Sequence, residues 1–226
     1  RVTETDPLFK ILATWIFCPL LAAIFSMMLF LLIKLVIKNV NLHLLRTDAY
    51  TRAGLVVAGA FGSYSLGANN IGNVMGVFVP VSPFTDFDIW GVYTVSSVQQ
   101  LFLLGAIAIS IGVMTYSKKV MQTVGSNLFP LSPISAWVVV ISHSIVLFLF
   151  ASQGLESFLI AKNLPSIPLV PVSSSQAIVG AVIGVALVKG GRGIQWQVLG
   201  EIASGWLATP IVAGFLCFVG LYFFYL

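Results

Sequence analysis

The stretch Ile11–Ile33, ILATWIFCPLLAAIFSMMLFLLI, contains no charged residue and is followed by Lys34 and Lys38. About 20 consecutive apolar residues are enough for an α-helix to cross the hydrocarbon core of a bilayer. The stretch therefore predicts a membrane-spanning helix. Three further stretches without charges predict further spans, namely Ala53–Val79, Ile89–Tyr116 and roughly Ile202–Leu226.

The composition of the whole chain agrees with this reading. Of the 226 residues, 58% are hydrophobic and 8% are charged, whereas about 25% are charged in a typical soluble domain. Folding removes only around 70% of the surface of a chain of this size from water, so a soluble fold would expose much apolar surface. We therefore predict an all-α integral membrane protein that crosses the cell membrane several times.

The charged residues and cysteines indicate which classes of partner the chain can have. The net charge is +4, but the basic residues lie mostly between the apolar stretches, as in cytoplasmic loops. No basic stripe or nucleic-acid module is present, so the expected partner is the lipid bilayer and not a nucleic acid. Cys18 and Cys217 both lie in apolar stretches and predict neither a disulfide framework nor a zinc site. We expect no cofactor.

The two ends of the chain share a pattern. Trp15-Ile-Phe-Cys-Pro19 matches Trp206-Leu-Ala-Thr-Pro210 at a constant offset of 191 residues. Chance likeness between two hydrophobic helices is the alternative to an internal repeat. As a repeat, the pattern divides the chain into the last transmembrane helix of a preceding repeat (1–38), an interfacial linker (39–52) and a C-terminal repeat (53–226). We then expect a missing N-terminal repeat of the same protein.

The charges predict how the spans are oriented. Basic residues are enriched in the cytoplasmic loops of membrane proteins, and placing them inside puts Asp86 outside. The helix of Trp15 then runs inward and the helix of Trp206 runs outward. This is the plan of an inverted-repeat secondary transporter with broken helices. The residues placed inside are Lys34, Lys38, Arg46, Arg52, Lys118, Lys119, Lys189 and Arg192.

A polar cluster, Gly67-Ala-Asn-Asn-Ile-Gly-Asn73, interrupts the second apolar stretch. Amides at membrane depth are costly unless they find partners. The glycines would allow the backbone to unwind, and free carbonyls together with Asn side-chain oxygens suit a small hard cation. Asn69, Asn70 and Asn73 are therefore candidate ion-binding residues for a transported Na⁺, with no resident metal. The alternative is close helix packing, with Asn joining neighbouring helices.

A second cluster, Pro171-Val-Ser-Ser-Ser-Gln176, opens the apolar run Ala177–Val188. Twelve helical residues rise only about 18 Å, which is too short to cross a bilayer. We therefore predict a re-entrant helical hairpin at about 134–188, with its tip at this cluster. A helix N-terminus attracts anions, so the candidate substrate-binding residues are Ser173, Ser174, Ser175 and Gln176. The alternative is an ordinary N-cap in a surface loop.

Both clusters resemble motifs of the inorganic phosphate transporter (PiT) family. The stretch 67–73 is similar to Gly-Ala-Asn-Asp-x-Ala-Asn, and 171–176 is similar to Pro-Val-Ser-Thr-Thr-His. The resemblance covers nearly the whole chain and matches the C-terminal half of the family. It implies two inverted repeats, each with a re-entrant hairpin, and symport of inorganic phosphate with Na⁺ or H⁺. The family's Asp is Asn70 here and its His is Gln176, which weakens a proton-relay reading.

Three other functions remain open at this point. A permease for sulfate or another oxyanion would use the same fold, since neutral donors hold both tetrahedral anions. In a non-transporting membrane subunit, the glycines and asparagines would only pack helices. An intramembrane hydrolase would use His143 beside Ser142 and Ser144, but no oxyanion element supports it, so we predict that the chain is not an enzyme. The sequence also leaves a homo-oligomer open.

Overall fold

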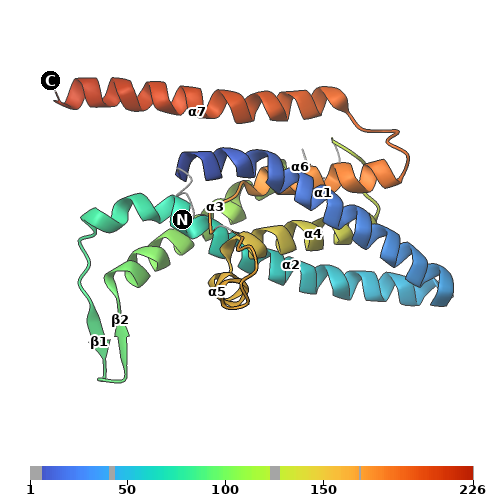
Figure 1. Ribbon diagram of the computed structural model, residues 1–226, viewed down its shortest axis with the longest axis horizontal. Helices are drawn as coiled ribbons and strands as arrows, with labels where there is room; N and C mark the ends of the chain where they lie inside the picture. Colours follow the sequence, from blue (N-terminus) through green and yellow to red (C-terminus); the bar gives the residue numbers. More distant parts are fainter. Residues whose placement is uncertain (1–6, 41–43, 123–127, 168, 226) are drawn as a thin grey trace.

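The computed structural model describes residues 7–40, 44–122, 128–167 and 169–225. These residues form mainly long helices, as Figure 1 shows. The elements are α1 (Pro7–Val40), α2 (Leu44–Met75), the 3₁₀ helix η1 (Gly76–Val81), β1 (Phe87–Ile89), β2 (Tyr93–Val95), α3 (Ser97–Gln122), α4 (Pro133–Ala151), α5 (Gln153–Ala161), α6 (Ser174–Val188) and α7 (Trp196–Tyr225).

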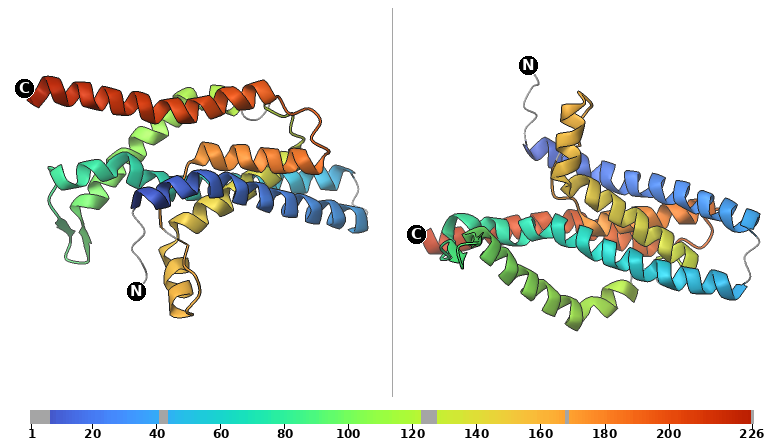
Figure 2. Two further views of the ribbon diagram at one scale, coloured as in Figure 1. Left: turned by 45° about the horizontal axis from the view of Figure 1, so that its top comes forward. Right: turned by 90° about the horizontal axis from the view of Figure 1, so that it is seen from below.

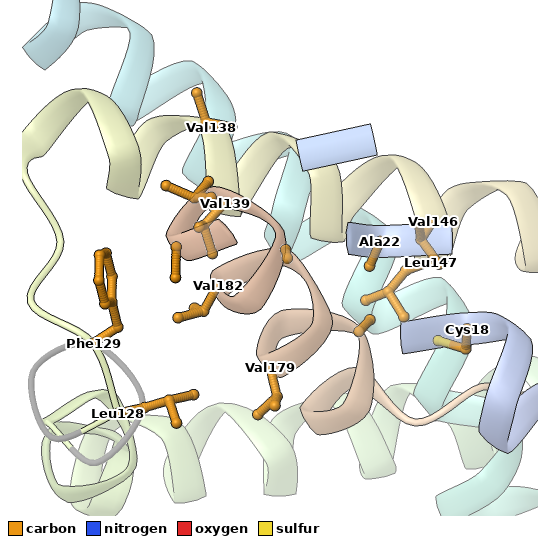
Figure 3. Packing of buried hydrophobic residues seen from close by; sticks show 14 of the residues in the cluster. Cys18, Ala22, Leu128, Phe129, Val138, Val139, Val146, Leu147, Val179 and Val182 are labelled. Carbon is orange, nitrogen blue, oxygen red and sulfur yellow. The ribbon is translucent and has the colours of Figure 1, made fainter. Parts of the chain in front are cut away.

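The centre of the molecule is a pair of helices, α4 and α6, with α1 and α2 packed around them. α6 contacts α1 and α4, and α2 runs along α4. Figure 2 shows α5 projecting sideways from one end of this pair. The core side chains come mainly from α1, α4, α6 and the segment before α4, with Val172 and Ile194 from the segments on either side of α6. Figure 3 labels Cys18, Ala22, Leu128, Phe129, Val138, Val139, Val146, Leu147, Val179 and Val182.

Two glycines allow α1 and α6 to approach closely. A Cβ atom at Gly180 would overlap the backbone of Pro19, and one at Gly184 would overlap Ala23 and Ser26. The Gly-x-x-x-Gly spacing puts both glycines on one face of α6. Helices in a bilayer associate through such close packing, because lipid is already as apolar as the side chains that they bury. The position of α6 therefore depends on the small residues of α1.

Four helices among the described residues are long and apolar enough to cross a membrane: Ile11–Val40, Ser97–Lys118, Pro133–Ala151 and Trp196–Phe224. The prediction of a helical membrane protein is confirmed at this level. The predicted span Ala53–Val79 covers the second part of α2 and the start of η1; α2 has 32 residues but is not among the four. The glycines and asparagines of α2 lower its mean hydropathy.

The predicted start of the third span, Ile89, is wrong. Phe87–Ile89 and Tyr93–Val95 pair as an antiparallel hairpin, and α3 begins only at Ser97. Trp90 and Gly91 form the turn with positive φ angles of 53° and 68°, which suit a tight hairpin turn. The all-α prediction therefore needs this small correction. A short apolar run does not by itself distinguish a strand from a helix.

The stretch predicted as an interfacial linker, residues 39–52, is also divided differently. α1 continues to Val40, and α2 begins at Leu44, so Leu44–Arg52 is the first part of a long helix. An ion pair between Arg52 and Asp48, one turn apart, lies on the exposed surface of this part. Residues 41–43 lie outside the described residues.

Candidate functional site

Asn69 joins the two polar clusters. Its Nδ2 donates to Val172 O at 2.8 Å, and its Oδ1 accepts from Val172 N at 3.2 Å. The side chain is 5% exposed, so this pair of bonds is buried. Nδ2 also donates to Asn70 Oδ1 at 3.1 Å. The structure thus connects α2 to the residue directly before the serine cluster, across 103 positions of sequence.

The Asn cluster lies on an unbroken helix, so the predicted unwinding at 67–73 is wrong. α2 continues as an α-helix to Met75 and changes to a 3₁₀ helix only at Gly76. The carbonyls of the motif are therefore engaged in the helix. The oxygens that remain for a ligand are those of the side chains, of which Asn70 is half-buried and Asn73 is exposed.

The serine cluster forms the N-terminus of α6. Ser173 is the N-cap: its Oγ accepts from Gln176 N at 3.4 Å and lies 3.0 Å from Ser175 Oγ. The capping role that the sequence left open is therefore present for Ser173. Ser174 and Ser175 follow it in the first turn, where backbone N–H groups have no carbonyl one turn back to bond with. Two backbone donors and two hydroxyls therefore gather at this end of the helix.

A cavity of about 330 Å³ lies beside the Asn69–Val172 contact. Its volume corresponds to roughly ten water molecules at liquid density. The structure places Asn69, Asn73 and Pro171 on its wall. Ser173–Gln176 do not line it; they begin two residues beyond Pro171 in the sequence. The cavity wall consists of Ala68, Asn69, Gly72, Asn73, Phe150, Ala151, Gln153, Leu169, Val170 and Pro171.

Sequence reasoning missed Gln153 on this cavity wall. Gln153 is the first residue of α5, and Ser152 caps that helix by accepting from Leu155 N at 3.2 Å. The signal was present as a polar Ser-Gln pair directly after the apolar stretch 134–151. A helix break at that pair turns the chain sideways and places Gln153 on the wall of the same cavity as Asn73.

Lys189 holds the other end of the α4–α6 pair. Its Nζ donates to Ser135 Oγ at 2.7 Å and lies 5.4 Å from the ring centre of Phe30 and 5.7 Å from that of Phe129. Such cation–ring contacts are attractive, most of all where water is excluded. The pair is thus tied at Lys189 at one end and, through Val172, to Asn69 at the other.

His143 does not form a hydrolase dyad with its neighbours. Within the described residues, Ser144 Oγ donates to Val140 O at 2.6 Å, and Ser142 Oγ has no partner. A nucleophile needs a base within hydrogen-bonding reach. Neither serine therefore carries the arrangement that a hydrolase requires.

Comparison of the amino-acid sequence with known proteins identifies its relatives. The model of the phosphate transporter family matches residues 2–217. The chain belongs to the phosphate transporter family. The predicted resemblance to a phosphate transporter family is thereby confirmed, and the family is one of transporters and not of enzymes.

Individual members of the phosphate transporter family are distant in sequence. A putative phosphate permease of Methanocaldococcus jannaschii is 26% identical over 210 residues, which are 93% of this chain and 58% of the permease. A sodium-dependent phosphate transporter 2 of Xenopus tropicalis is 24% identical over 166 residues, 70% of this chain and 22% of that protein. A putative phosphate permease of Pyrococcus furiosus is 29% identical over 159 residues, 70% of this chain and 35% of the permease.

The chain therefore spans little more than half the length of the first of these relatives, and less of the others. No solved structure matches the chain.

Proposed function

We propose that the chain forms the C-terminal repeat of an ion-coupled symporter that moves inorganic phosphate across the cell membrane. The observation that carries the proposal is the Asn69–Val172 contact, which joins α2 to the residues just before the donor-rich N-terminus of α6, next to a largely apolar cavity lined in part by Asn69 and Asn73. Membership of the phosphate transporter family supports phosphate as the anion. The name of a sodium-dependent relative supports Na⁺ as the cation.

The anion would bind at the N-terminus of α6. The free N–H groups of the first turn and the hydroxyls of Ser174 and Ser175 would replace part of its hydration shell. The positive end of the helix dipole adds attraction for a negative charge. No fixed positive charge is needed, so the anion could also leave again. Ser173 would act mainly by capping the helix and aligning Ser175.

The cation would bind beside the anion, on α2. Side-chain oxygens of Asn70 and Asn73 are hard ligands of the kind that Na⁺ prefers, and Asn69 would position them while holding the tip. Two opposite charges that lie close together attract each other, which lowers the free-energy cost of holding either one in a low-dielectric site. Each ligand then binds better when the other is present, by the same factor, which is the thermodynamic basis of symport.

The same proposal includes the inverted repeat. α6 has 15 residues, which rise about 22 Å, less than the roughly 30 Å of a hydrocarbon core. A re-entrant hairpin at about 134–188 would bring its N-terminus to the middle of the membrane. Residues 1–38 would be the last helix of a preceding repeat, and 53–226 the following one.

An impermeant thiol reagent should then label cysteines introduced at 118 and 189 from the cytoplasm and at 86 from outside. Labelling of position 189 from outside contradicts this orientation.

Transport by the complete protein in proteoliposomes tests the function. We expect uptake of labelled phosphate that rises with an inward Na⁺ gradient. Replacing Ser174 and Ser175 by Ala should weaken phosphate binding by roughly 1–3 kcal/mol per lost partner. Asn70→Leu should reduce the Na⁺ dependence first. Ser110→Ala is the matched control, because this helical serine of α3 only donates to Ala106 O.

The outcomes separate the function from the site. Absence of phosphate uptake by the wild-type protein contradicts the function. Unchanged phosphate affinity in a folded Ser174→Ala, Ser175→Ala variant contradicts the site and leaves Ser173 as a simple N-cap.

A further inference from the structure

The first turn of α6 contains a buried oxygen without a hydrogen-bond donor. Gln176 is 5% exposed, and within the described part of the chain its side-chain Oε1 has no partner. The other buried amide of the site, Asn69, uses both its oxygen and its nitrogen. Buried polar atoms in proteins are nearly always paired, so an unpaired one at a helix N-terminus points to a ligand that is not part of the chain.

The position of Gln176 connects this oxygen to the proposed anion site. Its backbone N–H donates to Ser173 Oγ, so the residue belongs to the same turn as the three serines. The spacing 176, 180, 184 also places it on the face of α6 whose glycines pack against α1. Gln176 therefore lies where the α1–α6 contact ends and the N-terminus of α6 begins.

The side-chain oxygen of Gln176 places a chemical requirement on the ligand that the serines and backbone N–H groups do not. Backbone N–H groups donate to the oxygens of any oxyanion, and serine hydroxyls donate or accept. They do not separate sulfate from phosphate. An amide oxygen only accepts a hydrogen bond, so a ligand satisfies it only by bringing a hydrogen. Phosphate keeps at least one P–OH group near neutral pH, whereas sulfate has none.

We infer that Gln176 is the residue that selects protonated phosphate over sulfate, by accepting a hydrogen bond from a P–OH group through Oε1. The inference rests on the proposed function and specifies its substrate as an oxyanion that carries a hydroxyl. A buried acceptor left unpaired disfavours the wrong ligand strongly, as in enzymes that reject substrates lacking one hydroxyl. One such bond corresponds to roughly a 10- to 100-fold preference.

Four anions test this inference in competition with labelled phosphate, using the complete protein in proteoliposomes. Arsenate keeps a hydroxyl, while sulfate and monofluorophosphate are tetrahedral anions without one at neutral pH. In the wild-type protein, unlabelled phosphate and arsenate should compete, and sulfate and monofluorophosphate should compete at least 10-fold more weakly.

The variants then assign the preference to Gln176. Gln176→Met removes the acceptor at similar size and should bring the phosphate-to-sulfate ratio close to one. Gln176→Glu keeps an acceptor and should retain the phosphate-to-sulfate ratio, while its added negative charge weakens the binding of all four anions. Ser175→Ala is the control, because loss of a shared donor should weaken all four anions alike and leave the ratio unchanged.

Each outcome has one meaning. Gln176→Met with a wild-type ratio overturns the inference, even while phosphate transport itself continues. If Gln176→Met does not fold, Gln176→Glu decides: a retained preference supports the acceptor role, and a lost preference overturns it. Weak competition by arsenate would also overturn it. If the wild-type protein takes up no phosphate, the proposed function itself fails.

Discussion

α1 and α7 share the same pattern of small residues, but only α1 buries it. Cys18, Ala22 and Ser26 of α1 are 0% exposed. The residues 191 positions later are equally small and are exposed, namely Thr209, Ala213 and Cys217. Figure 1 shows α1 lying against α6, while α7 runs along one side of the molecule. In lipid, a small-residue face gains nothing by itself; it is buried only where a partner helix comes close enough to pack.

The largest expected effect follows from the partner glycines. Gly180→Leu would force a side chain into the backbone of Pro19, which cannot move aside as a side chain could. We expect a loss of about 3 kcal/mol or more in the free energy of unfolding. Gly214→Leu, on the exposed face of α7, has no atom within 4 Å of the added Cβ and should change little.

Unfolding of both variants in detergent micelles, followed by circular dichroism, measures this difference. Equal losses for Gly180→Leu and Gly214→Leu would break the comparison between α1 and α7, because both faces would then be packed.

Asn69 is the polar counterpart of α1, since its buried amide depends mainly on its two bonds with Val172. Asn69→Ala leaves the N–H and C=O of Val172 without partners and should cost roughly 1–3 kcal/mol in stability. The N-terminus of α6 should also lose its fixed position, and phosphate affinity should fall with it. Asn73→Ala is the control for stability, because Asn73 is exposed on the cavity wall. A stability loss in Asn73→Ala as large as that in Asn69→Ala would contradict the role of Asn69.

Lys189 extends the comparison to a charge held by several partners. Lys189→Met removes the bond to Ser135 and the contacts with Phe30 and Phe129, at a cost of roughly 0.5–2 kcal/mol. Lys162→Met, at the exposed end of α5, should be neutral. The same unfolding measurement applies. An unchanged free energy of unfolding in Lys189→Met would contradict the conclusion that Lys189 holds that end of the α4–α6 pair.

The smallest effect is expected where both partners face outward. The pair of Arg52 and Asp48 is largely exposed, and exposed pairs one turn apart contribute only about 0.3–0.5 kcal/mol. Asp48→Asn should therefore shift the unfolding midpoint by little, and less at high salt. A shift as large as that of Lys189→Met would mean that this surface packs against something in the membrane.

Hydropathy alone was sufficient for the spans whose whole length is apolar. The stretch 11–33 and the last span from 202 lie within candidate membrane helices of the structure. The stretch 134–151, predicted as one arm of a re-entrant hairpin, is also long and apolar enough to cross a membrane. Hydropathy failed at residues 89–96, because a Trp-Gly turn with positive φ angles allowed a hairpin in an apolar stretch. The position of a turn depends on local backbone geometry, which mean hydropathy does not describe.

The sequence was sufficient to predict the two polar clusters of the candidate site, but not how they lie relative to each other in the fold. The motifs around Asn69 and Ser173 identified the right segments, since dense polar groups are rare in apolar stretches. Their contact was not predictable, because the partner of Asn69 lies 103 positions away. The predicted unwinding failed for the same reason: glycines permit an unwound backbone, but the amide found its partner without it.

The continuity of α2 has a mechanical consequence. Its 32 residues form a rod about 48 Å long, with Asn69 near one end and Leu44 at the other. An unwound segment at 67–73 would have worked as a hinge between the Asn cluster and the rest of the helix; an unbroken helix does not. Any displacement of the N-terminus of α6 would therefore pull on α2 as one rigid rod as long as Asn69 stays bonded to Val172. The nearest pivot is Gly76, where the α-helix gives way to η1.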